Sequence, residues 1–100
     1  MVGTLVMAAV LHGKVTLGPL RPVCQATMPC EGPAVGVVLT FRHAGRLWRV
    51  KTDGHGVYRV SLPAGRYLVS ASRGIRLAPS SVIVLPGTHT RGFAIDTGIR

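Results

Sequence analysis

The stretch Lys51–Val69, KTDGHGVYRVSLPAGRYLV, decides the fold of this chain. It contains a carboxylate, an imidazole, two phenols and three glycines, a mixture that also occurs in reaction centres. Within it, however, two short runs of alternating apolar and polar residues are bounded by glycine and proline, which is the pattern of β-strands and turns. Because the opposite alternation would bury an arginine, the predicted inward-facing residues are Tyr58, Val60 and Leu62 in the first run and Tyr67 and Val69 in the second.

The connection before the first run is predicted to be a turn of three or five residues. If Trp48 and Tyr58 face the same core from paired strands, the period of two requires an odd number of loop residues, which excludes a two-residue hairpin. Asp53 suits a side-chain bond to the backbone that closes the turn, and Gly54 or Gly56 supplies the positive φ. The polar residues of this segment therefore indicate a corner of a sheet rather than a site.

The connection between the two runs, LPAGRY, is the next corner. Pro63 presets φ there, and Gly65 takes the left-handed position of the turn. The predicted structural turn residues of the whole stretch are thus Asp53, Gly54, Gly56, Pro63 and Gly65.

Outside this stretch, proline and glycine divide the chain into short β-rich segments, and no window shows helical spacing over more than two turns. The segment AVGVVLTFR alternates, with Val35, Val37, Leu39 and Phe41 predicted on the inner face. The expected strands cover residues 13–18, 34–42, 45–52, 56–62, 65–73, 81–86 and 90–96. Their spacing predicts an all-β fold, a seven-stranded antiparallel Greek-key β-sandwich.

Length and composition indicate one folded domain. A chain of 100 residues buries roughly two-thirds of its unfolded surface, which is enough for a single core. Hydrophobic residues make up 47% and charged residues 15%, which excludes an acidic or serine-rich disordered chain. We expect this domain to span residues 12–100.

The first eleven residues, Met1–Leu11, carry no charge. They are long enough for the apolar region of a signal peptide and too short to span a bilayer, but no basic flank precedes them. Two interpretations stay open: a truncated signal peptide, or an apolar first strand.

The charge balance favours an anionic partner. Twelve lysines and arginines stand against Glu31, Asp53 and Asp96, which gives a formal net charge of +9. Nucleic acid, anionic lipid and acidic cell-wall polymers all carry the complementary charge. The basic residues are scattered singly, however, so a solvated surface that only keeps the protein soluble is the alternative.

One group of cations is predicted to form an anion-binding face. Arg49, Lys51 and Arg59 share one side of strands expected to be neighbours, and Arg42 and Arg46 flank the preceding turn. Since like charges on adjacent strands repel, a structural sheet gains nothing from them, which favours an acidic cell-wall polymer or anionic lipid headgroups as partner. Nucleic acid is disfavoured because most of the five aromatic residues are assigned to the core, and a single-strand binder needs exposed ones.

Nothing in the sequence predicts catalysis. Three acids offer little for a general acid and base, and no serine shows a nucleophile-elbow pattern. The four histidines, expected in or beside loops or strand ends, lack the short spacings of metal ligands; they are His12, His43, His55 and His89. We therefore expect no enzyme, no metal and no cofactor.

The central stretch resembles the hallmark of the carboxypeptidase regulatory-like domains, in which Thr-Asp, a Gly, an aromatic and Leu-Pro-x-Gly-x-Tyr mark two successive hairpins. The matching residues are Thr52, Asp53, Gly56, Tyr58, Leu62, Pro63, Gly65 and Tyr67. The resemblance covers about residues 12–96 and implies a transthyretin-like (prealbumin-like) sandwich. The ends, GPLRPVC and DTGIR, are similar to those of small exported bacterial proteins built on this domain.

The resemblance implies an extracytoplasmic address, secreted or in the cell envelope, and no established activity. We accordingly expect a non-enzymatic module with a structural or interaction role and no transmembrane span. The alternative is a small hydrolase or metal-dependent enzyme on the same fold. The transthyretin-like hydrolases end in a Tyr-Arg-Gly-Ser tail that this chain lacks, and the iron-binding dioxygenases of similar fold use tyrosines that are here predicted to point into the core.

The cysteines, Cys24 and Cys30, are six positions apart in a proline-rich segment between the first two strands. The separation allows the chain to fold back, neighbouring prolines disfavour a helix, and the resemblance to exported proteins supplies an oxidising compartment. We predict a disulfide. Free thiols in a cytosolic protein and a metal half-site are the alternatives.

Overall fold

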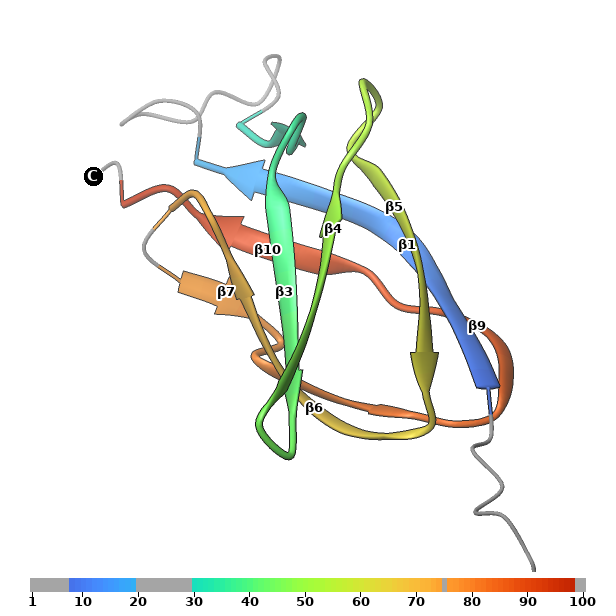
Figure 1. Ribbon diagram of the computed structural model, residues 1–100. Helices are drawn as coiled ribbons and strands as arrows, with labels where there is room; N and C mark the ends of the chain where they lie inside the picture. The colour runs from blue at the N-terminus through green and yellow to red at the C-terminus, as the bar shows by residue number, and fades with distance from the viewer. Residues whose placement is uncertain (1–7, 20–29, 75, 99–100) are drawn as a thin grey trace, which may run out of the picture.

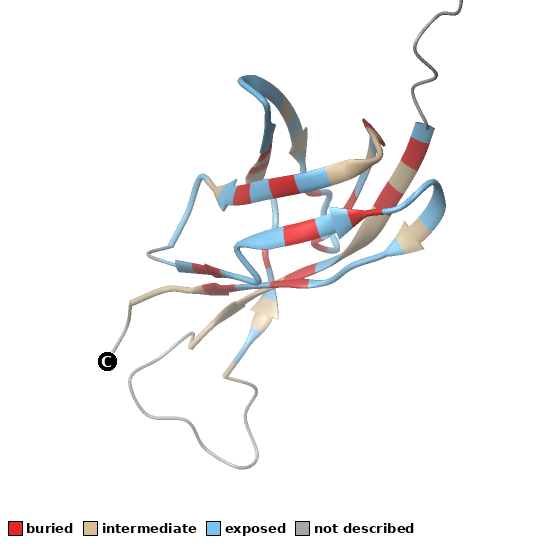
Figure 2. Ribbon diagram, turned by 90° about the horizontal axis from the view of Figure 1, so that it is seen from below, coloured by how far each residue is buried: buried red, intermediate tan, exposed pale blue. Residues whose placement is uncertain are grey.

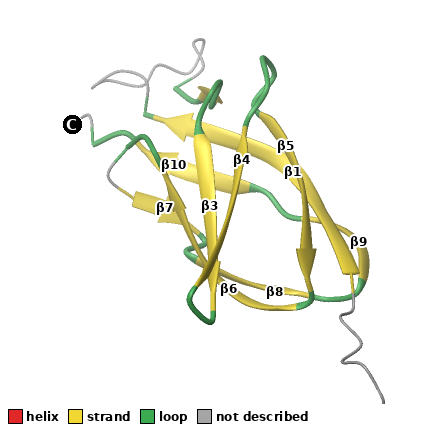
Figure 3. Cartoon of the chain, viewed as in Figure 1, coloured by secondary structure: helices red, strands yellow, loops and turns green. Residues whose placement is uncertain are grey.

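The computed structural model describes residues 8–19, 30–74 and 76–98. All regular structure in these ranges is β, which confirms the predicted class (Figure 3). Two sheets enclose one core, and in Figure 1 the strands β3 and β4 of one sheet run across β1 and β10 of the other. The larger sheet contains β1 (Ala8–Gly18), β2 (Gly32–Pro33), β5 (Val57–Pro63), β7 (Arg76–Ala78), β9 (Gly87–Thr90) and β10 (Phe93–Asp96). The smaller contains, in spatial order, β4 (Arg46–Lys51), β3 (Val38–His43), β6 (Gly65–Ala71) and β8 (Ser81–Val84).

Seven strands were expected and the described residues form ten. The additional strands β2, β7 and β9 have two to four residues each, too short for an alternating pattern to be recognised in the sequence. The first strand also begins at Ala8 instead of Gly13. Residues 8–11 of the apolar N-terminal segment therefore lie in β1, whereas residues 1–7 are outside the described ranges.

The long strand β1 organises the larger sheet. Its first half pairs with β5 on one side and β9 on the other, and its second half pairs with β2 and β10. The pairings with β9 and β10 are parallel, so the expectation of a purely antiparallel fold is wrong for this sheet. First and last strands can run in the same direction here because the chain between them passes through the other sheet.

The central stretch does not form hairpins within one sheet. β5 pairs with β1, while β4 pairs with β3, and β6 pairs with β3 and β8. The five-residue connection 52–56 does have the predicted odd length, but it carries the chain from the smaller sheet to the larger, and the corner at Pro63–Gly65 carries it back. The alternation of apolar and polar residues predicted which side chains of these strands face inward, but it did not predict which strands pair.

The core lies between the sheets and is centred on Phe41. Its ring lies 6.2 Å from that of Tyr58, 6.3 Å from that of Tyr67 and 6.1 Å from that of Phe93, measured between centroids. These are distances at which tilted and edge-to-face aromatic pairs contribute beyond simple burial. The predicted inward residues are confirmed as buried or packed against the core: Tyr58, Val60, Leu62, Tyr67 and Val69.

One predicted inward residue is on the surface. Val37, Leu39 and Phe41 are fully buried, but Val35 is 47% exposed. The alternation is interrupted at Gly36, whose φ of 68° lies in the left-handed region and turns the chain just before β3. Ala34 consequently takes the buried position at the start of this segment.

Candidate anion-binding face

The predicted cations divide between the two sheets. Arg42, Arg49 and Lys51 are exposed on β3 and β4, where the inward positions are filled by core residues. Arg59 lies on β5, opposite His12 of β1, and therefore belongs to the other sheet. The prediction that it shares a face with Arg49 and Lys51 is wrong, because it assumed that β4 and β5 pair.

Arg46 stands at the edge of this arrangement. It begins β4, pairs with His43 across the hairpin, and places its guanidinium carbon 5.4 Å from the centroid of the Trp48 ring. A cation over an indole at this distance is attracted by the negative face of the ring. Arg46 therefore packs against Trp48. The Trp48 side chain lies on the side of β4 opposite to the outward residues.

A cation from β6 completes the group. Tyr67 and Val69 are buried, so Arg66, Leu68 and Ser70 point outward beside β3. Sequence reasoning missed Arg66, although the alternation in GRYLVSASR already places it outward; the missing information was that β6 pairs with β3. We define the basic face as the outer side of the smaller sheet, with the four cations Arg42, Arg49, Lys51 and Arg66.

Among the described residues of its four strands, the basic face carries no carboxylate. Its other outward positions on the four strands are filled by hydroxyl or aliphatic residues: Val38, Thr40, Leu47, Leu68, Ser70, Ser81 and Ile83. The resulting alternation of buried and exposed positions is visible in Figure 2. No side chain of opposite charge on the face itself thus neutralises the four cations.

A shallow hollow lies at the centre of the basic face. It encloses about 120 Å³ between β3 and β6 and is lined by Thr40, Arg42, Leu68, Val69 and Ser70. Two hydroxyls and a guanidinium therefore surround a space that can hold a small oxyanion. Guanidinium groups bind phosphate and carboxylate oxygens through paired N–H donors.

The predicted turn residues have structural partners. The Asp53 carboxylate accepts hydrogen bonds from the N–H groups of His55 (2.8 Å) and Val57 (2.9 Å). These bonds, that of Val57 first, together with the nearby His55, lower the pKa of Asp53. Gly56 has a φ of 75°, whereas Gly54 is not in the positive region.

At the second corner, Pro63 ends β5 and its carbonyl accepts a 2.5 Å hydrogen bond from the Tyr67 hydroxyl. Gly65 begins β6 with a φ of 157°. The two residues therefore close the corner by which the chain returns to the smaller sheet.

Both tyrosine hydroxyls are engaged by backbone carbonyls. Tyr58 donates to the carbonyl of Arg91 at 2.6 Å, and Tyr67 to that of Pro63. Burial raises the pKa of both phenols, opposed in part by the positive charges of Arg91 and Arg46 respectively. A phenolate that binds a metal must be deprotonated, so these environments work against that role.

The histidines are dispersed. His43 donates from Nδ1 to the carbonyl of Arg66 (2.8 Å), and His89 from Nε2 to that of Pro86 (2.9 Å). His89 lies beside the end of β9 and His55 in the turn after β4, as expected, whereas His12 lies in the middle of β1. Within residues 8–19, 30–74 and 76–98, no three His, Cys, Asp or Glu side chains come together as a metal site.

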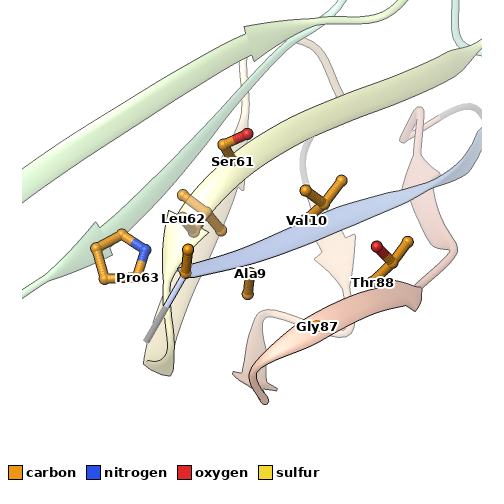
Figure 4. A pocket seen from close by; sticks show the side chains of 8 residues that line it. Ala9, Val10, Ser61, Leu62, Pro63, Gly87 and Thr88 are labelled. Atoms are coloured by element: carbon orange, nitrogen blue, oxygen red, sulfur yellow. The ribbon is translucent and has the colours of Figure 1, made fainter. Parts of the chain in front are cut away.

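Two further hollows lie on the larger sheet. One, of about 400 Å³, surrounds the start of β1, and Figure 4 shows it between β1, β5 and β9. The lining residues that the structure describes carry no titratable side chain: Ala8, Ala9, Val10, Ser61, Leu62, Pro63, Gly87 and Thr88. The described residues of this hollow therefore supply no general acid or base.

The other hollow, of about 270 Å³, brings together two of the three acids, which sequence reasoning did not anticipate. Glu31 and Asp96 line it beside Arg76. The Asp96 carboxylate already accepts a 2.9 Å hydrogen bond from the N–H of Gly98. Among the lining residues that the structure describes there is no histidine, serine or cysteine.

Cys30 is half-buried just before β2, and Cys24 lies outside the described ranges, so their disulfide stays a prediction.

No helix that could cross a bilayer is found in the part of the chain that the structure describes. Comparisons of the chain with models of known protein families, with curated proteins and with solved structures return no match.

Proposed function

We propose that this protein is a non-enzymatic interaction module that binds an anionic partner of the cell envelope through its basic face. The observation that carries the proposal is the gathering of Arg42, Arg49, Lys51 and Arg66 on one sheet surface without a carboxylate. Thr40 opposes Arg49 and Ser70 across the strands, so hydroxyls separate the cations instead of acids.

The charge arrangement supports binding better than it supports folding. Cross-strand pairs of opposite charge stabilise a sheet, whereas like charges on adjacent strands weaken it. Arg42 and Arg49 are diagonal neighbours, since Thr40, two residues before Arg42, is the partner of Arg49. An anion bound between them relieves their repulsion, which gives the surface a preference for negatively charged partners.

We further propose that the domain is of the carboxypeptidase regulatory-like, transthyretin-like type and acts outside the cytoplasm. The support is the motif from Thr52 to Tyr67, its position at two corners between two sheets, and the similarity of both chain ends to small exported proteins. A Cys24–Cys30 disulfide belongs to the same proposal, because such bridges persist in oxidising compartments.

The absence of an activity is part of the proposal. The hollow with Glu31 and Asp96 offers two carboxylates, but its described lining residues supply no nucleophile and no imidazole. The hollow at the start of β1 has no titratable group. Neither combines the nucleophile, base and oxyanion donors that a hydrolase requires.

Retention on a sulfated-dextran column tests the proposal. We expect wild-type protein to bind at low salt and to elute as salt screens the cations. Substituting Arg42, Arg49 and Arg66 together by Ser should lower the salt needed for elution. The matched control replaces three arginines of the larger sheet and its connections, Arg59, Arg76 and Arg91, and removes the same charge. Equal shifts in both triple variants would show that net charge alone, and not the basic face, binds the polymer.

A further inference from the structure

The basic face also carries exposed aliphatic side chains in fixed positions between the cations. Across the strands, Arg42 pairs with Leu47 on one side and with Leu68 on the other, and Leu68 pairs in turn with Ser81. Arg66 pairs with Ile83. Each of the two central cations is therefore flanked directly by a hydrocarbon side chain.

These aliphatic residues are unusually open for a sheet face. Leu47 is 45% exposed, Leu68 58% and Ile83 60%, and Leu85, just after β8, is 57% exposed. Ile83 lies diagonally beside Leu68, because Ser81, two residues before it, is the partner of Leu68. Single exposed hydrophobic residues need no explanation, but a group on one face indicates a surface for binding.

The proposed function does not say to which chemical class the anionic partner belongs. The side chains of the basic face favour one class. A soluble acidic polymer uses the cations and gains nothing from the leucines and isoleucine. A second copy of the same face uses the aliphatic residues but brings Arg42, Arg49, Lys51 and Arg66 against their own counterparts, which is repulsive. An anionic phospholipid surface uses both kinds of side chain.

The hollow beside Arg42 has room for the phosphate of such a lipid. Its 120 Å³ are bounded by the hydroxyl residues Thr40 and Ser70 and by the arginine, while Leu68 forms part of its wall. A lipid phosphate in this space meets hydrogen-bond donors, and its acyl chains then lie on the side of Leu47, Leu68 and Ile83.

Resting on the proposed function, we infer that the basic face docks on the surface of an anionic phospholipid membrane, with cations at the phosphates and aliphatic residues inserted between headgroups. This is peripheral binding. Each Lys or Arg near such a surface strengthens binding by roughly fivefold, so the four cations and three aliphatic residues act together.

Co-sedimentation with vesicles of phosphatidylglycerol and phosphatidylcholine tests the inference. We expect binding to mixed vesicles and none to vesicles of pure phosphatidylcholine. Replacing Leu47, Leu68 and Ile83 together by Thr keeps strand propensity and should weaken vesicle binding about tenfold or more. The same variant should elute from sulfated dextran at the wild-type salt concentration. The matched control is Val35→Thr with Val57→Thr, two exposed valines off the basic face, and it should bind vesicles as wild type does.

The outcomes separate the two proposals. Normal elution from sulfated dextran with vesicle binding that is absent, or unchanged by the threonine substitutions, overturns the membrane inference alone. Loss of the distinction between the two arginine triple variants on sulfated dextran overturns the proposed function itself. Concentration-dependent dimers that the threonine substitutions abolish, measured by sedimentation, would assign the aliphatic residues to contact between copies and would also overturn the inference. Circular dichroism shows whether each variant is folded.

Discussion

Two hydrogen bonds join Thr52, just after β4, to Val37, just before β3. The N–H of Val37 donates to the Thr52 hydroxyl oxygen, and the N–H of Thr52 donates to the Val37 carbonyl, both at 2.9 Å. The Thr52 hydroxyl in turn donates to the carbonyl of Ala34. Thr52 is the one buried polar residue in the described ranges. Its hydrogen bonds connect the turn before β3 to the start of the connection 52–56, by which the chain passes from the smaller sheet to the larger.

Thr52→Val is expected to lower the free energy of unfolding by about 1 to 3 kcal/mol. The substitution keeps the shape of the side chain but leaves a buried N–H and a buried carbonyl without their hydroxyl partner. Thr52→Ser retains the hydroxyl and should cost less. Urea unfolding of the three proteins measures the difference. A Thr52→Val variant that is as stable as wild type while Thr52→Ser is destabilised would mean that the methyl group and not the hydroxyl stabilises this site.

The loop glycines are expected to differ sharply in their tolerance of alanine. At Gly56, with φ at 75°, a Cβ would lie 2.8 Å from the Val15 carbonyl oxygen, so both conformation and space oppose it. Gly45 has a similar φ of 79° with open space around it, and Gly54 has neither constraint. Gly54→Ala should be nearly neutral, Gly45→Ala should cost about 1 kcal/mol, and Gly56→Ala should cost clearly more. Thermal unfolding of the three variants gives the order, and a Gly56→Ala variant as stable as Gly45→Ala would contradict the packing at this turn.

Local alternation predicted more of the molecule than did any argument about pairing. It placed Tyr58 and Tyr67 in the core, because an arginine beside each excludes the opposite face. The alternation gave a wrong prediction for Val35, because the turn at the following glycine interrupts the period of two. Three of the four cations of the basic face were predicted, Arg42, Arg49 and Lys51. Arg59 lies on the other sheet, since which strands pair depends on long-range packing that a period of two does not encode.

Acidification is expected to weaken the turn after β4 through Asp53. Its pKa is lowered in the folded state, so the folded protein holds this proton less tightly than the unfolded chain does. The stabilisation is therefore present above the ordinary pKa of 3.8 and is lost as the pH falls through the lower folded value. Asp53→Asn should be less stable than wild type near neutral pH, and the difference should shrink toward about pH 2.

Unfolding midpoints measured across that pH range check the role of Asp53. Glu31→Gln is the control, because it removes an exposed carboxylate away from the turn. A gap between wild type and Asp53→Asn that stays constant at all pH values would show that the charge of Asp53 contributes nothing.

Removal of residues 1–11 is expected to destabilise the protein strongly. Ala9 and Leu11 are buried in β1, which is paired there with both β5 and β9. Loss of a single buried leucine side chain costs about 2 to 5 kcal/mol, and this deletion also exposes the edges of two strands. Removal of residues 1–7 leaves β1 intact and serves as the control. We accordingly expect mass spectrometry of the native protein to find Ala9–Leu11 retained; a stable product that begins at His12 would refute this.

The predicted bridge between Cys24 and Cys30 is expected to act locally. Closing so short a loop stabilises the folded state by about 2 kcal/mol on the chain-entropy model, and its main effect is to restrain the connection that leads into β2. Reduction should therefore lower the unfolding midpoint modestly without changing the fold, and a Cys24→Ser, Cys30→Ser variant should match the reduced protein. The decisive measurement is thiol titration of unreduced, unfolded protein isolated from its native compartment. No reactive thiol is expected, whereas two per chain would overturn the disulfide and remove one support of the extracytoplasmic address, because a reducing compartment keeps such a pair open.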